Sequence, residues 1–100
     1  MIIAVNISKA LKEGKTPIEA AEKAWDLNIE NCREHDFVIG VEKGQIIRCF
    51  IILEIFQDIE NEQRVAFKLK QCGDETEKMI RSYLKANDIN LGGVQRGKYI

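Results

Sequence analysis

The chain has 100 residues, of which 45% are apolar and 31% are charged, and its formal net charge is −1. This length predicts a single domain over residues 1–100 with one apolar core. No apolar run reaches the roughly 18 residues that a membrane-spanning helix needs, so we expect no membrane segment. The first residues also lack the basic region of a signal peptide.

The three cysteines, Cys32, Cys49 and Cys72, lack the C-x-x-C spacing of redox and zinc motifs. An odd number of cysteines without that spacing is typical of reduced thiols in a cytoplasmic protein. The single histidine, His35, follows Cys32 at a ligand-like spacing, but a zinc site would also need Cys72 and an acid as ligands. We therefore predict no metal and no other cofactor.

Charge is distributed unevenly along the chain. Residues 1–63 hold 7 basic and 12 acidic residues, whereas residues 64–100 hold 8 basic and 4 acidic residues. One interpretation is that the two parts interleave in one domain and the charges mix. The other is that the last third forms a basic face that attracts phosphate groups.

Apolar periodicity and turn residues predict an α+β domain with the element order β-α-β-β-β-α-β. The predicted elements are a strand over Ile2–Ile7, a helix from Thr16 to about Leu27, strands over Phe37–Val41, Gln45–Gln57 and Arg64–Lys70, a helix from Asp74 to near Asn87, and a strand over Val94–Ile100. A short helical turn over Ser8–Leu11 follows the first strand. Residues Asn28–Asp36 are expected to form a loop.

The first helix has a complete start signal. Thr16 suits the N-cap, Pro17 the first helical position, and Glu19 closes a capping box. The second helix shows a similar Asp-x-x-Glu pattern at Asp74. The apolar stripe of the first helix, which predicts packing on a sheet, consists of Ile18, Ala21, Ala24 and Trp25.

The central hairpin is the strongest fold signal. Val41–Gly44 suits a type I turn with Gly44 in the left-handed conformation, which is the usual three-residue hairpin. One face of the next strand is wholly apolar and consists of Ile47, Cys49, Ile51, Leu53 and Ile55. A strand this long with one apolar face is typical of a barrel or a strongly coiled sheet. The sequence leaves open which face of residues 45–57 is buried.

With this element order, the chain resembles the PUA-like group of small barrels, which includes the ASCH and EVE domains, and a set of uncharacterised short bacterial-type proteins near that group. The matching stretches, within residues 18–100, are Ala24–Leu27, Phe37–Val41, Gly44–Ile52, Arg64–Phe67 and Gln95–Ile100. The resemblance implies a small, curved, mainly antiparallel β-barrel with a helix over one opening. It also implies binding of RNA, or of DNA with modified bases, in a cleft beside the barrel.

The predicted function is therefore a non-enzymatic binding module for nucleic acid or a nucleotide-like ligand. The residues expected to bind the ligand are Trp25, Arg48, Arg64, Lys68, Arg96, Lys98 and Tyr99. The aromatic residues would stack on a base and the basic residues would contact phosphate.

Some of these residues also have a structural interpretation. Trp25 suits a core anchor beneath the first helix, and Arg48 suits a cross-strand pair with Glu42 or Glu54. Lys68, on a half-exposed strand, suits protection of a sheet edge against aggregation.

No catalytic residues are predicted, because the sequence contains no P-loop, no G-x-S-x-G motif and no histidine pair. A small enzyme acting on nucleotides is the weakest alternative. The main rival is a protein-interaction or homo-oligomerisation module. In that interpretation Phe50, Ile52 and Phe56 form a contact surface, and the C-terminal strand adds to a neighbour's sheet edge.

Overall fold

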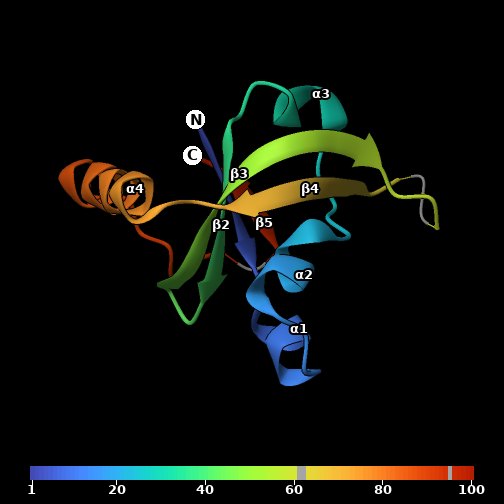
Figure 1. Cartoon of the computed structure of the whole chain (residues 1–100), viewed down its shortest axis with the longest axis horizontal. Coiled ribbons are helices and arrows are strands. Elements are labelled where there is room, and N and C mark those ends of the chain that lie inside the picture. Colours follow the sequence, from blue (N-terminus) through green and yellow to red (C-terminus); the bar gives the residue numbers. More distant parts are fainter. Residues whose placement is uncertain (61–62, 95) are drawn as a thin grey trace.

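The structure, a computed structural model, describes residues 1–60, 63–94 and 96–100. Its strands are β1 (Ile2–Asn6), β2 (Phe37–Glu42), β3 (Gln45–Gln57), β4 (Val65–Gln71) and β5 (Gly97–Tyr99). Its helices are α1 (Ser8–Lys12), α2 (Pro17–Glu22), α3 (Ile29–Cys32) and α4 (Asp74–Ala86). Figure 1 shows the strands at the centre, with α4 set apart from the three short helices.

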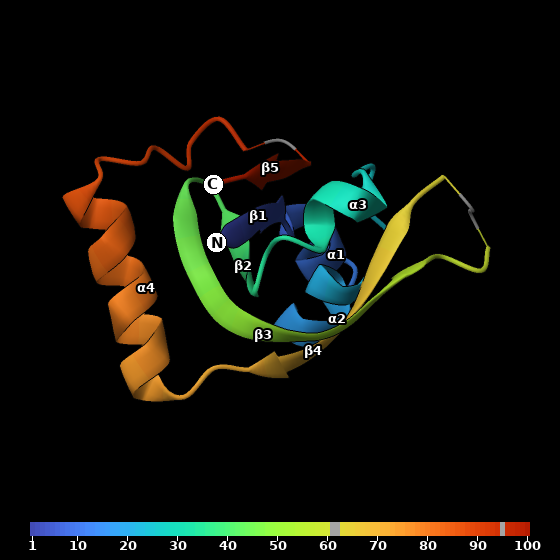
Figure 2. The same cartoon turned by 90° about the horizontal axis from the view of Figure 1, so that it is seen from above.

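The strands form one mixed sheet in the order β4-β3-β2-β1-β5. β1 and β2 are parallel, and the other neighbouring pairs are antiparallel. This confirms the α+β class and the long antiparallel hairpin. The sheet is not closed into a barrel, because β4 and β5 are its two edges. It is nevertheless strongly curved, and in Figure 2 β3 forms an arc around β1, β2 and α2.

One segment, Trp25–Asn28, contacts both edge strands, and we call it the bridging segment. Trp25 exchanges two backbone hydrogen bonds of 2.8 Å with Val65 at the start of β4. The Asn28 N–H donates to the Tyr99 hydroxyl on β5 over 2.9 Å. The gap between the sheet edges is therefore spanned by the connection between α2 and α3 instead of by strand pairing.

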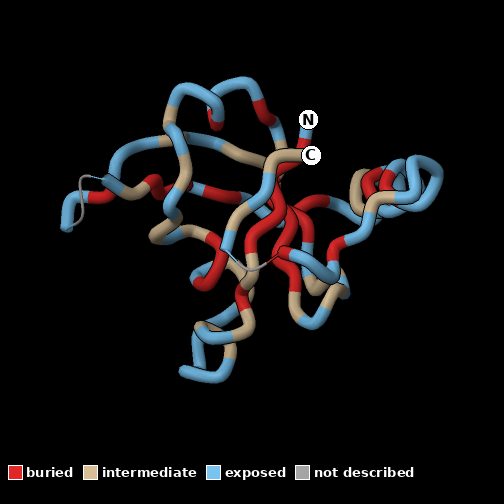
Figure 3. Tube along the Cα trace, turned by 180° about the vertical axis from the view of Figure 1, so that it is seen from behind, coloured by how far each residue is buried: buried red, intermediate tan, exposed pale blue. Residues whose placement is uncertain are grey.

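The buried side chains form two clusters, one on each face of the sheet. The cluster beneath α2 contains Ile3, Val5, Ile7, Ala20, Ala21, Val38, Phe50, Val65 and Phe67. The cluster beneath α4 contains Ile2, Ala4, Ile39, Val41, Cys49, Cys72, Ile80 and Leu84. Figure 3 shows that the buried residues follow the central strands between these two sides. Helices cover both faces of the sheet, so β2 has apolar residues on both of its faces.

The prediction of one wholly apolar face on β3 is wrong. Cys49 and Ile51 belong to the cluster beneath α4, whereas Ile47 and Ile55 pack into the cluster beneath α2. Pairing shifts register at Ile47 and again at Leu53, which is 51% exposed. Each shift inserts one residue, and one inserted residue exchanges the two faces of a strand.

The start of the first predicted helix is confirmed, and its end is not. Thr16 and Glu19 form the capping box, with Pro17 as the first residue of α2. The helix ends at Glu22 instead of Leu27, because the chain beyond it is extended and pairs with β4. The predicted loop over residues 28–36 contains α3, whose first turn is capped by the Asn28 side chain.

Three further boundaries differ from the prediction. Lys43 and Gly44 both have positive φ, 51° and 76°, so the hairpin is closed by a two-residue turn of the I′ kind instead of a three-residue loop. α4 has Gly73 as its N-cap and no side-chain cap, so Asp74 is its first helical residue. Within the predicted last strand, Gly97–Tyr99 is paired, and Gln95 lies outside the described residues.

Candidate functional site

A cleft of about 580 Å³ opens where β1 ends, between α1, α2 and the chain that precedes β5. The charged residues that line it are Lys9, Lys12, Glu13, Lys15, Lys23 and Arg96. We call it the basic cleft, since five of these six side chains are cationic. Its volume lies within the roughly 300–1,000 Å³ that is usual for small-ligand sites.

Asn6 holds the turn that places α1 beside this cleft. Its side-chain oxygen accepts the N–H of Ser8 over 3.0 Å, and its amide nitrogen donates to the Val94 carbonyl over 3.0 Å. Its backbone N–H donates to the Arg96 carbonyl over 2.8 Å, which fixes the opposite rim. The start of α1 and the segment that leads into β5 are thereby held by one residue, although they lie far apart in the sequence.

Trp25 supplies the aromatic surface of the cleft. Its indole N–H donates to the Ala21 carbonyl over 2.8 Å, and its backbone is fixed by the pairing with Val65. The ring packs against the core cluster beneath α2, and it also lines the cleft together with Ala10 and Ala20. Trp25 therefore serves as a core anchor, as one interpretation predicted, and it also forms part of the cleft wall.

Arg96 is the second predicted residue that lines the cleft. Its guanidinium lies 3.5 Å from the Asp26 carboxylate, and both side chains are mostly exposed. An exposed ion pair of this kind contributes little to stability and is screened by salt. The guanidinium is consequently available to an anion that enters the cleft.

The other predicted residues lie elsewhere on the molecule. Arg48, on β3 opposite Gly40, donates to the carbonyl of its neighbour Ile47 over 2.8 Å. Arg64 is half-buried and reaches the Ala24 carbonyl at 3.5 Å. Lys68 is exposed on the edge strand β4 opposite Glu54.

The two predicted residues on β5 differ from each other in exposure. Lys98 is exposed and pairs with Ala4. The Tyr99 ring packs against the core and against His35, with ring centroids 5.1 Å apart. The Tyr99 hydroxyl is engaged by the backbone of Asn28, so the ring serves the bridging segment instead of an open stacking surface.

Four lysines of the basic cleft were missed by the sequence analysis. Lys9, Lys12, Lys15 and Lys23 belong to a part of the chain whose total charge is negative, so the count over residues 1–63 concealed them. Their signal is local, because all four fall within residues 9–23 and two stand three residues apart on α1. A window over residues 9–15, with three lysines and one glutamate, shows a basic stretch before the predicted helix, and Lys23 lies within that helix.

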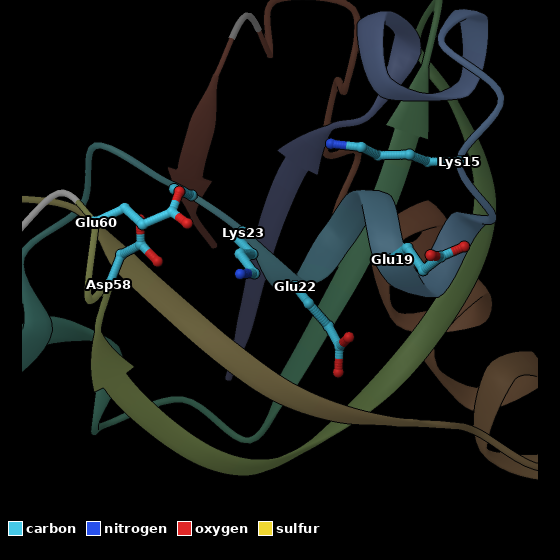
Figure 4. Close-up of a pocket in the computed structure, with 7 residues that line it drawn as sticks. Lys15, Glu19, Glu22, Lys23, Asp58 and Glu60 are labelled. Carbon is cyan, nitrogen blue, oxygen red and sulfur yellow. The ribbon is translucent and has the colours of Figure 1, made fainter.

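A second cleft, of about 410 Å³, adjoins the first and has the opposite charge. Its acidic residues are Glu19, Glu22, Asp58 and Glu60, and we call it the acidic cleft. Lys15 and Lys23 line both clefts and form the boundary between them. In Figure 4, Asp58 and Glu60 lie together on one side of Lys23, and Glu22 lies on the other.

Hydrogen bonds fix two of the acidic side chains. The Glu19 carboxylate accepts the N–H and the hydroxyl of Thr16, and these bonds lower the pKa of Glu19. Glu22 accepts the backbone N–H of Leu69 over 3.1 Å, which occupies a donor at the free edge of β4. Among the described residues, no group of three or more histidine, cysteine or acidic side chains is placed to hold a metal ion.

Within the described part of the chain, no helix is long and apolar enough to cross a membrane. No protein-family model matches the chain, and neither a curated protein nor a solved structure does. The site is thus defined by geometry and charge alone: a cation-lined cleft with one aromatic wall, on an α+β fold with an open, curved sheet.

Proposed function

We propose that the protein is a non-enzymatic binding module that takes nucleic acid or a nucleotide-like ligand in the basic cleft. The observation that carries this proposal is the group of five cations around the fixed indole of Trp25. Lysine and arginine neutralise phosphate, and an aromatic face stacks on any base. One cleft thus offers both interactions that a phosphorylated base requires.

The resemblance to the PUA-like group supports the same function. That resemblance implies a ligand cleft beside a curved barrel, and here the cleft lies beside a curved sheet whose edges are linked by the bridging segment. In this proposal the Trp25–Asn28 segment substitutes for the strand pairing that would close a barrel.

The intrinsic fluorescence of Trp25, the only tryptophan, tests the proposal. Short single-stranded RNA, single- and double-stranded DNA, and AMP are titrated at low salt and again at higher salt. We expect a saturable change in emission that weakens with salt, because binding to phosphate releases counterions. The absence of both a fluorescence change and a mobility shift for every ligand would reject the proposal.

A pair of matched variants locates the site. Lys9→Glu with Lys12→Glu reverses two charges in the basic cleft, and Lys68→Glu with Lys70→Glu makes the same change on β4. We expect the first pair to weaken binding at least about tenfold and the second pair to leave it nearly unchanged. Equal losses of affinity in both pairs would show that the ligand does not bind in the basic cleft.

A second candidate function, homo-oligomerisation, is favoured by an apolar groove of about 280 Å³ between α4 and the starts of β1 and β2. Met79 and Tyr83 line this groove from α4 and are 71% and 50% exposed. Phe50, named in the sequence analysis as a contact residue, is fully buried, so Phe50→Asp would unfold the chain instead of breaking a dimer.

The occupant that suits this groove is a second copy of the chain. The first turn of α4 carries Asp74 and Glu75, and its last turn carries Lys85. Two α4 helices packed antiparallel about a twofold axis would place each acidic end beside the partner's basic end.

Light scattering across a range of protein concentrations tests this candidate. We expect Met79→Glu to convert a dimer to a monomer, and the control Leu53→Glu, at another exposed apolar residue, to leave the dimer intact. A wild-type protein that stays monomeric at every concentration would reject the candidate.

A further inference from the structure

We infer that the ligand of the basic cleft is a single nucleotide with a terminal phosphate, free or at the end of a strand, and not the interior of a continuous strand. This inference rests on the proposed function and narrows its ligand. It follows from the acidic cleft, which begins at the Lys15–Lys23 boundary of the basic cleft.

The acidic cleft presents fixed negative charge beside the site. Its carboxylates are those of Glu19, Glu22, Asp58 and Glu60. Hydrogen bonds to Thr16 hold the Glu19 carboxylate in place, and the bond to Leu69 holds that of Glu22, so neither rotates freely away from an approaching anion. Asp58 is 8% exposed, and its backbone N–H donates to the Arg64 carbonyl over 2.9 Å.

A strand that entered the basic cleft and continued past Lys15 and Lys23 would carry its next phosphates along this acidic wall. Like charges repel, and salt screens the charges of buried Asp58 and half-buried Glu22 less than those of exposed Glu19 and Glu60. The acidic wall therefore closes the Lys15–Lys23 side of the basic cleft to a strand. The interior of a strand must leave the cleft in two directions and is disfavoured by this wall, whereas a nucleotide or the end of a strand need not pass it.

In this site Trp25 and the lysines bind different parts of one nucleotide. The indole, fixed by its hydrogen bond to Ala21, stacks on the base. Lys9 and Lys12 on α1 contact the phosphate, while Lys15 and Lys23 mark the limit of the site. The same Lys15–Lys23 boundary screens the bound phosphate from the acidic residues behind it.

Three probes that share one base separate this inference from the proposed function. They are dAMP, a linear oligodeoxyadenylate with a 5′-phosphate, and the same oligomer ligated into a circle without ends. We expect dAMP and the linear oligomer to bind with affinities within about threefold of each other, and the circle to bind at least roughly tenfold more weakly at the same salt.

Other named results would overturn the single-nucleotide site or the proposed function. A circle that binds as tightly as the linear oligomer would overturn the single-nucleotide site and leave nucleic-acid binding intact. If none of the three probes binds although RNA or double-stranded DNA does, the single-nucleotide site is overturned and the proposed function stands; if no nucleic acid or nucleotide binds, both fail.

A second pair of matched variants tests whether the acidic cleft is the cause. Glu19→Gln with Glu60→Gln removes two of its charges, and glutamine at position 19 still completes the capping box. Glu30→Gln with Glu75→Gln removes the same charge from α3 and α4.

We expect the first pair to raise the affinity for the circle relative to dAMP at least about fivefold, and the second pair to leave that ratio unchanged. An equal ratio in the wild type and in both pairs would show that the acidic wall does not select strand ends.

Discussion

Cys49 shows how an ionisable residue serves as core in this protein. It lies beneath α4 without exposed surface, and burial, assisted by the nearby Glu77 carboxylate, raises the pKa of its thiol from 9.0 to about 12. Burial also raises the pKa of the Cys32 and Cys72 thiols. A thiol with a raised pKa carries little thiolate at neutral pH, so Cys49 acts as a small apolar side chain, as its position in the sequence pattern indicates.

Stability should therefore fall at alkaline pH. The unfolded Cys49 thiol ionises near 9.0, whereas the folded thiol resists ionisation until about 12. The contribution of this group is complete below 9.0 and is lost as the pH rises through the window between these values. Urea unfolding under reducing conditions at pH 7.5 and pH 10.5 measures the loss.

Cys49→Ala is the variant that assigns this loss to one residue. It is less stable than the wild type at pH 7.5, because a core sulfur is removed. Its free energy of unfolding should nevertheless fall less between the two pH values than that of the wild type. Equal falls in both proteins would assign the alkaline loss to other groups.

At the scale of elements, the sequence predicted those features that depend on residues close together in the chain. The capping box of Thr16 and Glu19 and the bounds of β3 are set by neighbouring residues, and both agree with the sequence analysis. The bulges at Ile47 and Leu53 depend on how β3 pairs with β2 and β4, so periodicity along β3 alone contains no sign of them. The end of α2 likewise depends on the pairing of Trp25 with a strand 40 residues away.

The bridging segment is the element whose role can be tested most directly. Tyr99→Phe removes the hydroxyl that accepts the Asn28 N–H over 2.9 Å and leaves the ring in place. We expect a loss of about 1 kcal/mol in the free energy of unfolding, the usual contribution of one such hydrogen bond. Amide hydrogen exchange at Asn28 should become faster in the same variant.

Tyr83→Phe is the matched control, because Tyr83 is 50% exposed on α4 and lies outside the bridging segment. Its free energy of unfolding should change by less than about 0.5 kcal/mol. Similar losses in the two variants would show that the Asn28–Tyr99 contact does not hold the edges of the sheet together.

For the whole molecule, the distribution of charge matters more than its total. The net charge of −1 averages a basic cleft and an acidic cleft that share a boundary at Lys15 and Lys23. The sequence indicated Trp25 and one cation, Arg96, from the resemblance and from the positive charge of residues 64–100, and both line the cleft. It could not indicate that the lysines of residues 9–23 face Arg96, since their approach depends on the turn that Asn6 fixes.

Charge separated in this way predicts an unusual behaviour on ion-exchange resins. At pH 7 the protein is above its isoelectric point of about 5.9, so its total charge favours an anion exchanger. We expect it also to be retained on phosphocellulose at low salt, because the basic cleft presents a local cationic surface to the resin phosphates. Lys9→Glu with Lys12→Glu should abolish that retention. Lys68→Glu with Lys70→Glu changes the net charge equally and should preserve retention. A loss of retention in both variants would mean that retention depends on the total charge of the protein and not on the basic cleft.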